Sequence, residues 1–179
     1  MLPMGYYKAL AAKFDDVADL NRAHARLRLL KSQEEIDWYR IAARLSDLPI
    51  AALRREIRPG LDERDLGAIT EAAYLPWRGT TIIHFFGTTS MHNSDLCVPR
   101  QHLTTRKIDK GDVISCELTA SFWEHWGQVL RTFTVGEPFT PLYQKLHDTA
   151  DAAYDAIFKV LRPGCPVREL AVGAKVIEE

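Results

Sequence analysis

The spacing of apolar residues changes near Thr80, which predicts helices before this point and strands after it. From Gln33 to Ile57, apolar side chains recur at intervals of three and four, as on one face of an α-helix. The members of this expected stripe are Ile36, Tyr39, Ala43, Ile50, Leu53 and Ile57. Pro49 lies inside the run. Because proline lacks the amide hydrogen that a helix needs, we expect a kink or a restart near Asp47.

Polar residues mark the expected helix starts. Residues 32–35 read Ser-Gln-Glu-Glu, a capping box in which the serine and the second glutamate satisfy each other's free amides. Asp62 should begin a shorter helix that ends near Tyr74, and residues 140–141, Thr-Pro, suit the start of another. The apolar face expected for that last helix consists of Leu142, Leu146, Ala150, Ala153, Ile157 and Leu161. Residues 1–31 carry one short helical pattern, with Asp15 or Asp16 as its cap.

β-Branched and aromatic residues dominate the middle of the chain. The segments TTIIHFFG, DVISCEL, TASFWEHW and GQVLRTFTV, which begin at residues 80, 112, 119 and 127, are typical of strands. A hairpin turn is expected near Trp123, His125 and Trp126, whose exposed rings could cap a substrate or pack on a partner. Helices, then antiparallel-type strands, then helices indicate an α+β fold rather than a doubly wound sheet.

One segment of twenty residues occurs twice. DLPIAALRREIRPGLDERDL begins at Asp47 and returns, 104 positions later, as DAAYDAIFKVLRPGCPVREL from Asp151, with seven identical positions. Both copies contain Arg-Pro-Gly, at residues 58–60 and 162–164. Proline cannot continue a helix and glycine accepts a left-handed backbone, so each copy predicts a helix, an abrupt stop and a second helix. The repeat suggests two similar halves, with the chain ending as the second begins.

Composition narrows the function classes. The chain has 46% hydrophobic and 26% charged residues and a formal net charge of −1, which gives no electrostatic reason to expect nucleic acid or an anionic membrane as partner. No apolar stretch reaches membrane-spanning length, and the N-terminus lacks a signal-peptide layout. Three widely separated cysteines form neither a disulfide framework nor a zinc motif. We therefore expect buried or inert thiols and a cytoplasmic protein.

Three stretches follow one another along the chain: ARLRLLKSQEEIDWYRIAARLSD from Ala25, the repeated Arg-Pro-Gly segment, and IDKGDVISCELTASFWEHWGQVLRTFTVGEP from Ile108. Together they resemble the creatinase/prolidase/methionine-aminopeptidase family. The last is similar to that family's central hairpin, in which two carboxylates flank a turn before Arg-Thr-Phe and Val-Gly. The resemblance implies the α+β pita-bread fold, with residues 1–30 as the remnant of an N-terminal domain, 31–138 as the first half of a catalytic domain, and 139–179 as the start of its second half.

The resemblance makes Glu117 and Gln128 the expected catalytic pair. Strand alternation places Val113, Ser115 and Glu117 on one face, where a glutamate is either a site carboxylate or an edge residue in solvent. In metal-dependent relatives both matching positions are aspartates that bind two divalent ions. The neutral amide of Gln128 would leave four positive charges poorly balanced. We therefore expect no metal ligands and no cofactor.

The resemblance also bears on the expected histidine and arginine roles. Arg100 stands where the metal-free branch of the family has its acid/base histidine, and arginine cannot shuttle a proton near neutral pH. His92, in a polar loop, is the candidate proton shuttle, with His102 and His84 as alternatives. Arg100, Arg131 and His84 are the candidate substrate-binding residues, although the strand pattern favours a core or edge position for His84 and a structural role on the opposite strand face for Arg131.

Three functions remain open from the sequence. The first is a metal-independent hydrolase that cleaves a C–N bond in a small amide or imino-peptide and is inactive without further catalytic groups. The second is a metal-dependent Xaa-Pro aminopeptidase or dipeptidase with Mn or Zn. The third is a non-catalytic pita-bread binding module. Because an unfinished half would expose an apolar face and unpaired strand edges, we also expect a homodimer.

Overall fold

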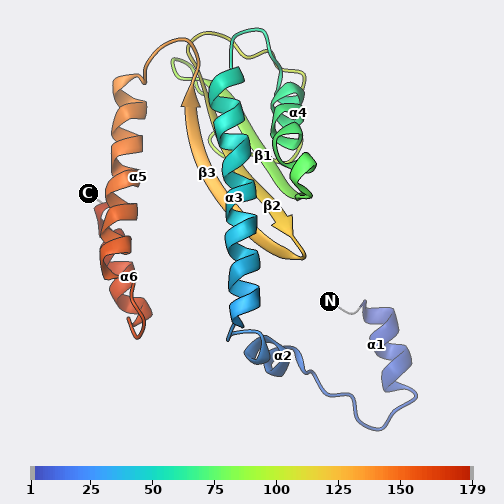
Figure 1. Cartoon of the computed structure of the whole chain (residues 1–179). Coiled ribbons are helices and arrows are strands. Elements are labelled where there is room, and N and C mark those ends of the chain that lie inside the picture. Colours follow the sequence, from blue (N-terminus) through green and yellow to red (C-terminus); the bar gives the residue numbers. More distant parts are fainter. Residues whose placement is uncertain (1–2, 178–179) are drawn as a thin grey trace. The chain divides into compact units, whose positions relative to one another are not determined.

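A computed structural model describes residues 3–177, and the chain divides into two compact units, Met1–Trp38 and Tyr39–Glu179. The first unit contains α1 (Met4–Ala11) and α2 (Asn21–Leu27) (Figure 1). Neither helix has a buried residue. The expectation of one helical pattern capped by Asp15 or Asp16 was therefore wrong. Asp19 instead accepts a hydrogen bond of 2.8 Å from the backbone amide of Asn21 at the start of α2.

Helix α3 (Gln33–Glu56) begins at the predicted capping box, which is confirmed by the reciprocal Ser32–Glu35 hydrogen bonds of 2.7 and 3.1 Å. The helix continues through Pro49, so the expected restart near Asp47 was wrong. Its buried residues are Ala42, Leu45, Ser46, Pro49, Ala52 and Leu53. Of the expected stripe, Leu53 is buried and Ile50 and Ile57 pack against the core while partly exposed, whereas Ile36 and Ala43 are exposed. The stripe is therefore confirmed only in the C-terminal half of the helix.

Three antiparallel strands follow in the order β1 (Thr80–Ser90), β2 (Asp112–Phe122) and β3 (His125–Thr134). Strand β2 joins the second predicted strand to the start of the third. The expected hairpin turn is confirmed at Trp123 and Glu124, whose φ angles are 47° and 64°. Two positive φ angles match the right-handed twist of the flanking strands.

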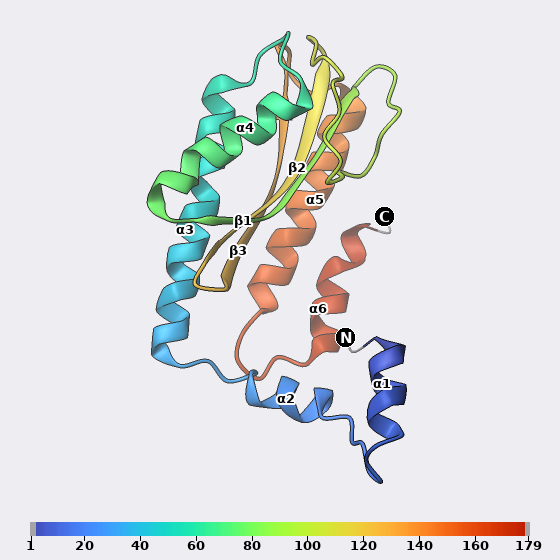
Figure 2. The same cartoon turned by 90° about the vertical axis from the view of Figure 1, so that its right-hand side faces the viewer.

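The core lies on one face of this sheet, beneath α3 and α4 (Glu63–Tyr74). Figure 2 shows both helices on the same side of the three strands. The largest buried cluster consists of Leu53, Leu66, Phe86, Ile108, Ile114, Cys116, Leu118, Val129 and Val135. Because β2 directs Ile114, Cys116 and Leu118 into this core, alternation directs Val113, Ser115 and Glu117 to the opposite face.

Helix α3 meets the β2–β3 hairpin through small residues. A Cβ atom on Gly127 would lie 2.5 Å from the backbone of Ala42, so only glycine fits there. The hydroxyl of Ser46 donates to the carbonyl of Gly127 and accepts a 3.1 Å hydrogen bond from the amide of Ala120. The backbones of helix and hairpin are therefore in contact, and the hydroxyl of one buried serine forms hydrogen bonds with a backbone group of each strand.

Both copies of the repeated segment adopt the predicted helix, turn and helix. The second copy is formed by α5 (Pro141–Val160) and α6 (Val167–Gly173), followed by the short η2 (Ala174–Ile177). Gly60 and Gly164 have φ angles of 92° and 82°, as expected at the helix exits. In each copy the arginine of Arg-Pro-Gly donates to the carbonyl two residues before it, at 3.0 Å from Arg58 and 3.2 Å from Arg162.

The two copies differ in how deeply their apolar side chains are buried. Leu53 and Leu66 in the first copy are fully buried, whereas their counterparts Ile157 and Leu170 are only partly buried. Ala153 is the single buried residue of α5. The apolar face of α5 therefore has little cover within residues 3–177. No helix within this part of the chain is both long and apolar enough to cross a membrane.

We predict that Gly127→Ala destabilises the fold by roughly 1–3 kcal/mol, because the added methyl group forces the hairpin away from the α3 backbone. Urea unfolding at neutral pH measures the change. Gly5→Ala is the control, since a Cβ atom at Gly5 has no atom within 4 Å. Equal stability of Gly127→Ala and the unsubstituted protein would contradict this account of the helix–hairpin contact.

Candidate functional site

The sheet face opposite the core is polar along its central strand. On β2 this face carries Val113, Ser115, Glu117, Thr119 and Ser121. The register places Ile83, Phe85, Gly87 and Thr89 of β1 and Trp126, Gln128, Leu130, Thr132 and Thr134 of β3 on the same face. Glu117 is the single ionisable side chain among these strand residues. We call this surface the open face.

Glu117 and Gln128 meet on the open face, as their spacing predicted. Gln128 lies directly opposite Thr119 and diagonal to Glu117, and its Nε2 donates a 2.7 Å hydrogen bond to Oε1 of Glu117. Glu117 is partly buried and Gln128 is exposed. Within residues 3–177, Glu117 has no ion-pair partner, so one carboxylate is oriented by a neutral amide and not by a cation.

This donor set does not fit two divalent ions. The amide of Gln128 turns its nitrogen, which cannot ligate a hard cation, towards Glu117. One carboxylate contributes a single negative charge against the four positive charges of a metal pair. No group of three or more His, Cys, Asp or Glu side chains in the described part of the chain is placed to hold a metal ion.

The structure does not bring His92 to this pair. His92 forms a 2.7 Å contact through Nε2 with Oε1 of Glu137, and its ring lies 3.4 Å from the position of a Cβ atom on Gly111. Gly111 precedes Glu117 by six residues of extended chain, which is roughly 20 Å at the rise of a strand. His92 therefore holds its loop to the segment after β3, and this geometry does not support the expected role as proton shuttle.

His84 lies on the other side of the sheet from Glu117. Its Nε2 is 2.6 Å from the hydroxyl of Tyr74 on α4, and its Nδ1 is 3.5 Å from a carboxylate oxygen of Glu71. Burial lowers the pKa of His84, and the nearby Glu71 opposes this shift only in part. The histidine joins α4 to β1, which is the core interpretation that the sequence left open.

The strand pairing of the two candidate arginines also directs their side chains to the core side of the sheet. Arg100 exchanges two 3.0 Å backbone hydrogen bonds with Phe86, whose side chain is in the core, and paired residues share a face. Arg131 lies opposite Cys116, and its Nη1 donates to the carbonyl of Leu130 at 2.6 Å. Of the six sequence-predicted site residues, the structure brings together only Glu117 and Gln128.

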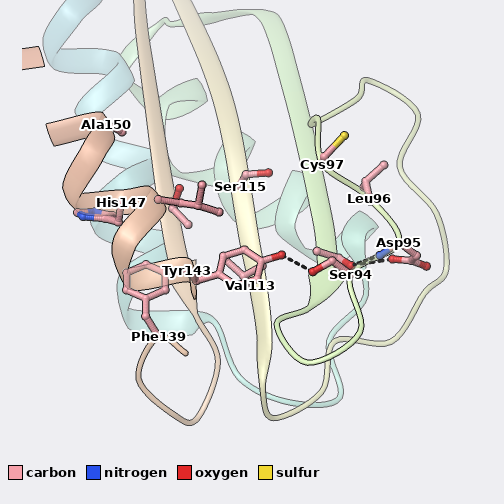
Figure 3. Close-up of a pocket in the computed structure, with 13 residues that line it drawn as sticks. Ser94, Asp95, Leu96, Cys97, Val113, Ser115, Phe139, Tyr143, His147 and Ala150 are labelled. Carbon is pink, nitrogen blue, oxygen red and sulfur yellow. Dashed lines mark hydrogen bonds between the residues drawn. The ribbon is translucent and has the colours of Figure 1, made fainter. Parts of the chain in front are cut away.

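A pocket of about 530 Å³ adjoins the pair along β2 (Figure 3). Its floor is the open face, at Thr89, Val113, Ser115 and Thr132. One wall is the loop from Ser94 to Cys97, and the other is Phe139 with Tyr143, Leu146, His147 and Ala150 of α5. Ser115 lines the pocket and lies two residues from Glu117, so the pocket and the pair lie on the same face of β2.

The pocket-lining residues of α5 were missed by the sequence analysis. Tyr143 and His147 are one helical turn apart, and the hydroxyl of Tyr143 is 2.5 Å from that of Ser94 across the pocket. Nδ1 of His147 lies 3.4 Å from the carboxylate of Asp151. The spacing of polar Tyr143 and His147 beside Leu146 was the available signal, but only the fold shows that this helix faces the sheet.

The loop wall of the pocket is tied to the first half of the fold. Asp95 accepts a 2.7 Å hydrogen bond from the hydroxyl of Thr89, which lowers the pKa of Asp95. At the other end of the loop, the buried carboxylate of Glu63 accepts hydrogen bonds of 2.7 and 2.8 Å from Thr104 and of 2.7 Å from Thr88. Burial by itself would raise the pKa of Glu63, but these hydrogen bonds lower it.

The three cysteines differ in environment. Cys97 is exposed on the pocket wall and Cys165 is partly buried, so of the three expected buried or inert thiols only Cys116 is buried. Cys116 lies in the core, where burial raises its pKa to about 12 and keeps the thiol protonated and inert.

The architecture and the site now allow comparison with known proteins. The sequence model of metallopeptidase family M24 matches residues 37–177, so the chain belongs to this family. It is 25% identical over 154 residues to the Xaa-Pro dipeptidase of Pyrococcus furiosus, covering 86% of this chain and 43% of that protein. It is likewise 25% identical to the Xaa-Pro dipeptidase of Pyrococcus horikoshii, covering 99% of this chain and 51% of that protein.

Solved structures agree on the fold. The prolidase from Pyrococcus furiosus superposes with a TM-score of 0.86 at 22% identity, over 99% of this chain and 52% of that one. The X-Pro aminopeptidase from Thermotoga maritima superposes with a TM-score of 0.79 at 18% identity, over 99% of this chain and 50% of that one. The α+β pita-bread fold expected from the sequence is confirmed. The chain spans about half the length of the relatives it matches.

We predict that Glu63→Gln lowers the free energy of unfolding by roughly 1–3 kcal/mol at pH 7, because charge-assisted hydrogen bonds to the loop are lost. The pKa of Glu63 is lowered in the folded state, so its stabilisation is complete above the ordinary value of 4.5. Below that value the unfolded state takes up the proton first, and the advantage over Glu63→Gln should shrink as pH falls through the folded pKa.

Urea unfolding at several pH values measures this difference. Glu124→Gln, at the exposed hairpin turn, is the matched control and should leave stability nearly unchanged. A difference between Glu63→Gln and the unsubstituted protein that stays constant down to pH 3 would contradict the assigned role.

Proposed function

We propose that this M24 chain is the part of a hydrolase that cleaves a C–N bond in a small amide or imino-peptide without a metal ion. The observation that carries the proposal is the hydrogen-bonded Glu117–Gln128 pair on the open face. It stands where metal-dependent relatives are expected to have two aspartates, yet it offers one carboxylate and an amide. The names of the similar proteins, Xaa-Pro dipeptidases, support an amide or imino-peptide as substrate class.

The chemistry follows from the two oxygens of Glu117. Oε1 accepts the hydrogen bond from Gln128, which holds the carboxylate in one orientation. In the proposed step, the oxygen of a water molecule bonds to the carbonyl carbon of the substrate while Oε2 of Glu117 takes a proton from that water. The same proton passes to the departing nitrogen when the C–N bond breaks, so Glu117 ends as it began. The sequence alone predicted no activity without further catalytic groups. Because a single oriented carboxylate can act as a general base by itself, we now expect slow turnover by these residues.

We also propose that two copies of the chain associate. Helix α5 presents large apolar side chains to solvent, including Tyr154 and Phe158, whose rings stack at 5.9 Å and are 67% and 65% exposed. Leu142, Leu146 and Leu161 are exposed on the same helix or at its end. Several large apolar side chains exposed on one helix are typical of an interface. A second copy of the chain would cover it in a homodimer.

The hydrolase proposal predicts slow release of proline from Leu-Pro that persists in EDTA and is lost in Glu117→Gln, because that substitution removes the proton acceptor. Glu124→Gln, on the same hairpin, should keep the activity. Chromatographic detection of proline measures turnover. Activity that EDTA abolishes and Mn²⁺ restores would favour the metal-dependent alternative. Substrate binding without turnover, unchanged by Glu117→Gln, would favour a non-catalytic binding module.

The dimer proposal predicts that Phe158→Asp weakens self-association by about tenfold or more, since a charge replaces a stacked ring in the interface. Analytical ultracentrifugation over a concentration series measures the dissociation constant. Lys159→Gln, at an exposed polar position of the same helix, is the control and should not change it. A protein that stays monomeric at high micromolar concentration would contradict the proposal.

A further inference from the structure

Another cavity lies between α3 and β3, the strand at the end of the sheet. Its volume is about 420 Å³. The lining residues of α3 are four and three positions apart and so share one face of the helix, namely Ile50, Arg54 and Ile57. The remaining lining residues are Arg131, Thr132, Phe133 and Thr134 of β3 and Phe139 after the strand. We call this cavity the α3–β3 groove.

Arginines from two different elements line this groove. Arg54 interrupts an otherwise apolar face of α3, because Ile50 and Ile57 on either side of it pack against the core cluster. On β3, Arg131 is paired with Cys116 of the core, so strand alternation directs Arg131 to the sheet face that α3 covers. Two positive charges that are far apart in the sequence therefore line one small cavity.

No ion pair in the described part of the chain includes either of these arginines. The acidic residues nearest to them along the chain are Glu56 and Glu137. An oxygen of Glu56 lies 3.7 Å from the guanidinium of Arg55, and an oxygen of Glu137 lies 2.7 Å from the ring of His92. All other lining residues of the groove are neutral. Like charges repel each other, and an anion bound between them replaces this repulsion by attraction.

The rest of the lining suits an apolar group. Phe133, like the two isoleucines of α3, packs against the core while partly buried, and Phe139 adds a second ring. The hydroxyls of Thr132 and Thr134 supply further hydrogen-bond donors. Guanidinium groups bind carboxylates through paired hydrogen bonds, and a cavity of this volume suits a small organic molecule.

We infer that the α3–β3 groove binds a small organic acid with an apolar body. Arg54 and Arg131 hold the carboxylate from the helix and from the strand, and the two phenylalanine rings contact the apolar body. Strand pairing directs Arg131 to the face opposite Glu117, so the groove is separate from the proposed catalytic pair. The inference therefore goes beyond the proposed function and does not depend on it.

Calorimetric titration of the 179-residue chain tests the inference with three ligands. 1-Naphthylacetate carries both carboxylate and rings, 1-naphthylacetamide is its neutral analogue, and acetate lacks the rings. We expect 1-naphthylacetate to bind about tenfold or more tightly than either of the others. Arg54→Gln and Arg131→Gln should each remove the preference over the amide. Arg55→Gln is the matched control on α3 and should keep it, because Arg55 lies outside the groove beside Glu56.

Two further variants locate the binding site. Ala150→Trp fills the pocket beside β2 from an exposed position of α5, and it should leave the affinity for 1-naphthylacetate unchanged. Glu117→Gln should also leave this affinity unchanged. Equal affinity of the unsubstituted protein for the acid and the amide would overturn the inference. A preference that either arginine variant retains, or that Ala150→Trp abolishes, would overturn it as well.

A free organic acid and the C-terminus of a peptide share this carboxylate chemistry. Comparing the affinities of 1-naphthylacetate and acetyl-Ala-Ala-Phe tells these two sources apart. Acid binding without hydrolysis of Leu-Pro would uphold the inference and reject the proposed hydrolase, and hydrolysis without acid binding would do the reverse.

Discussion

The close contact of α3 with the β2–β3 hairpin determines the rest of the second unit. The backbone of Gly127 packs directly against the backbone of Ala42, and the hydroxyl of Ser46 forms hydrogen bonds with both strands. Bulky side chains at these positions would hold helix and sheet apart. Because the contact sets which sheet face is covered, it also sets which face remains open. Glu117 lies on the open face for this reason.

The open face carries one carboxylate, that of Glu117, on a polar strand, and it adjoins a pocket lined by both apolar and polar side chains, Asp95 and His147 among them. Neighbours on β2 and β3 are neutral, so the electrostatics of the face are those of Glu117 itself. The relatives share the fold, with TM-scores of 0.86 and 0.79, while this chain carries an amide at one of the two hairpin positions. The shared fold therefore does not by itself establish the chemistry of the site in this protein.

Local rules explain which site predictions succeeded. Glu117 and Gln128 are eleven residues apart on two strands joined by a two-residue turn, and strand pairing brings such residues to one face. His92 lies in a loop, where no repeating geometry links sequence spacing to position, and it contacts Glu137 instead. The stripe of α3 was right for Ile50, Leu53 and Ile57, which pack on the core, but it missed Ala42 and Ser46, which face the hairpin where only small side chains fit.

The sequence by itself determined the local elements: the capped start of α3, the two Arg-Pro-Gly turns, the hairpin, and the alternation that pairs Glu117 with Ser115 on one face. These follow from backbone sterics and nearest-neighbour hydrogen bonds, which act over a few residues. Three features were decided only by the tertiary structure. Tyr143 of α5 lines a pocket, His84 is buried against Tyr74, and Arg100 is directed to the core side of the sheet. Such contacts depend on how distant segments pack, and packing is set by the whole fold at once.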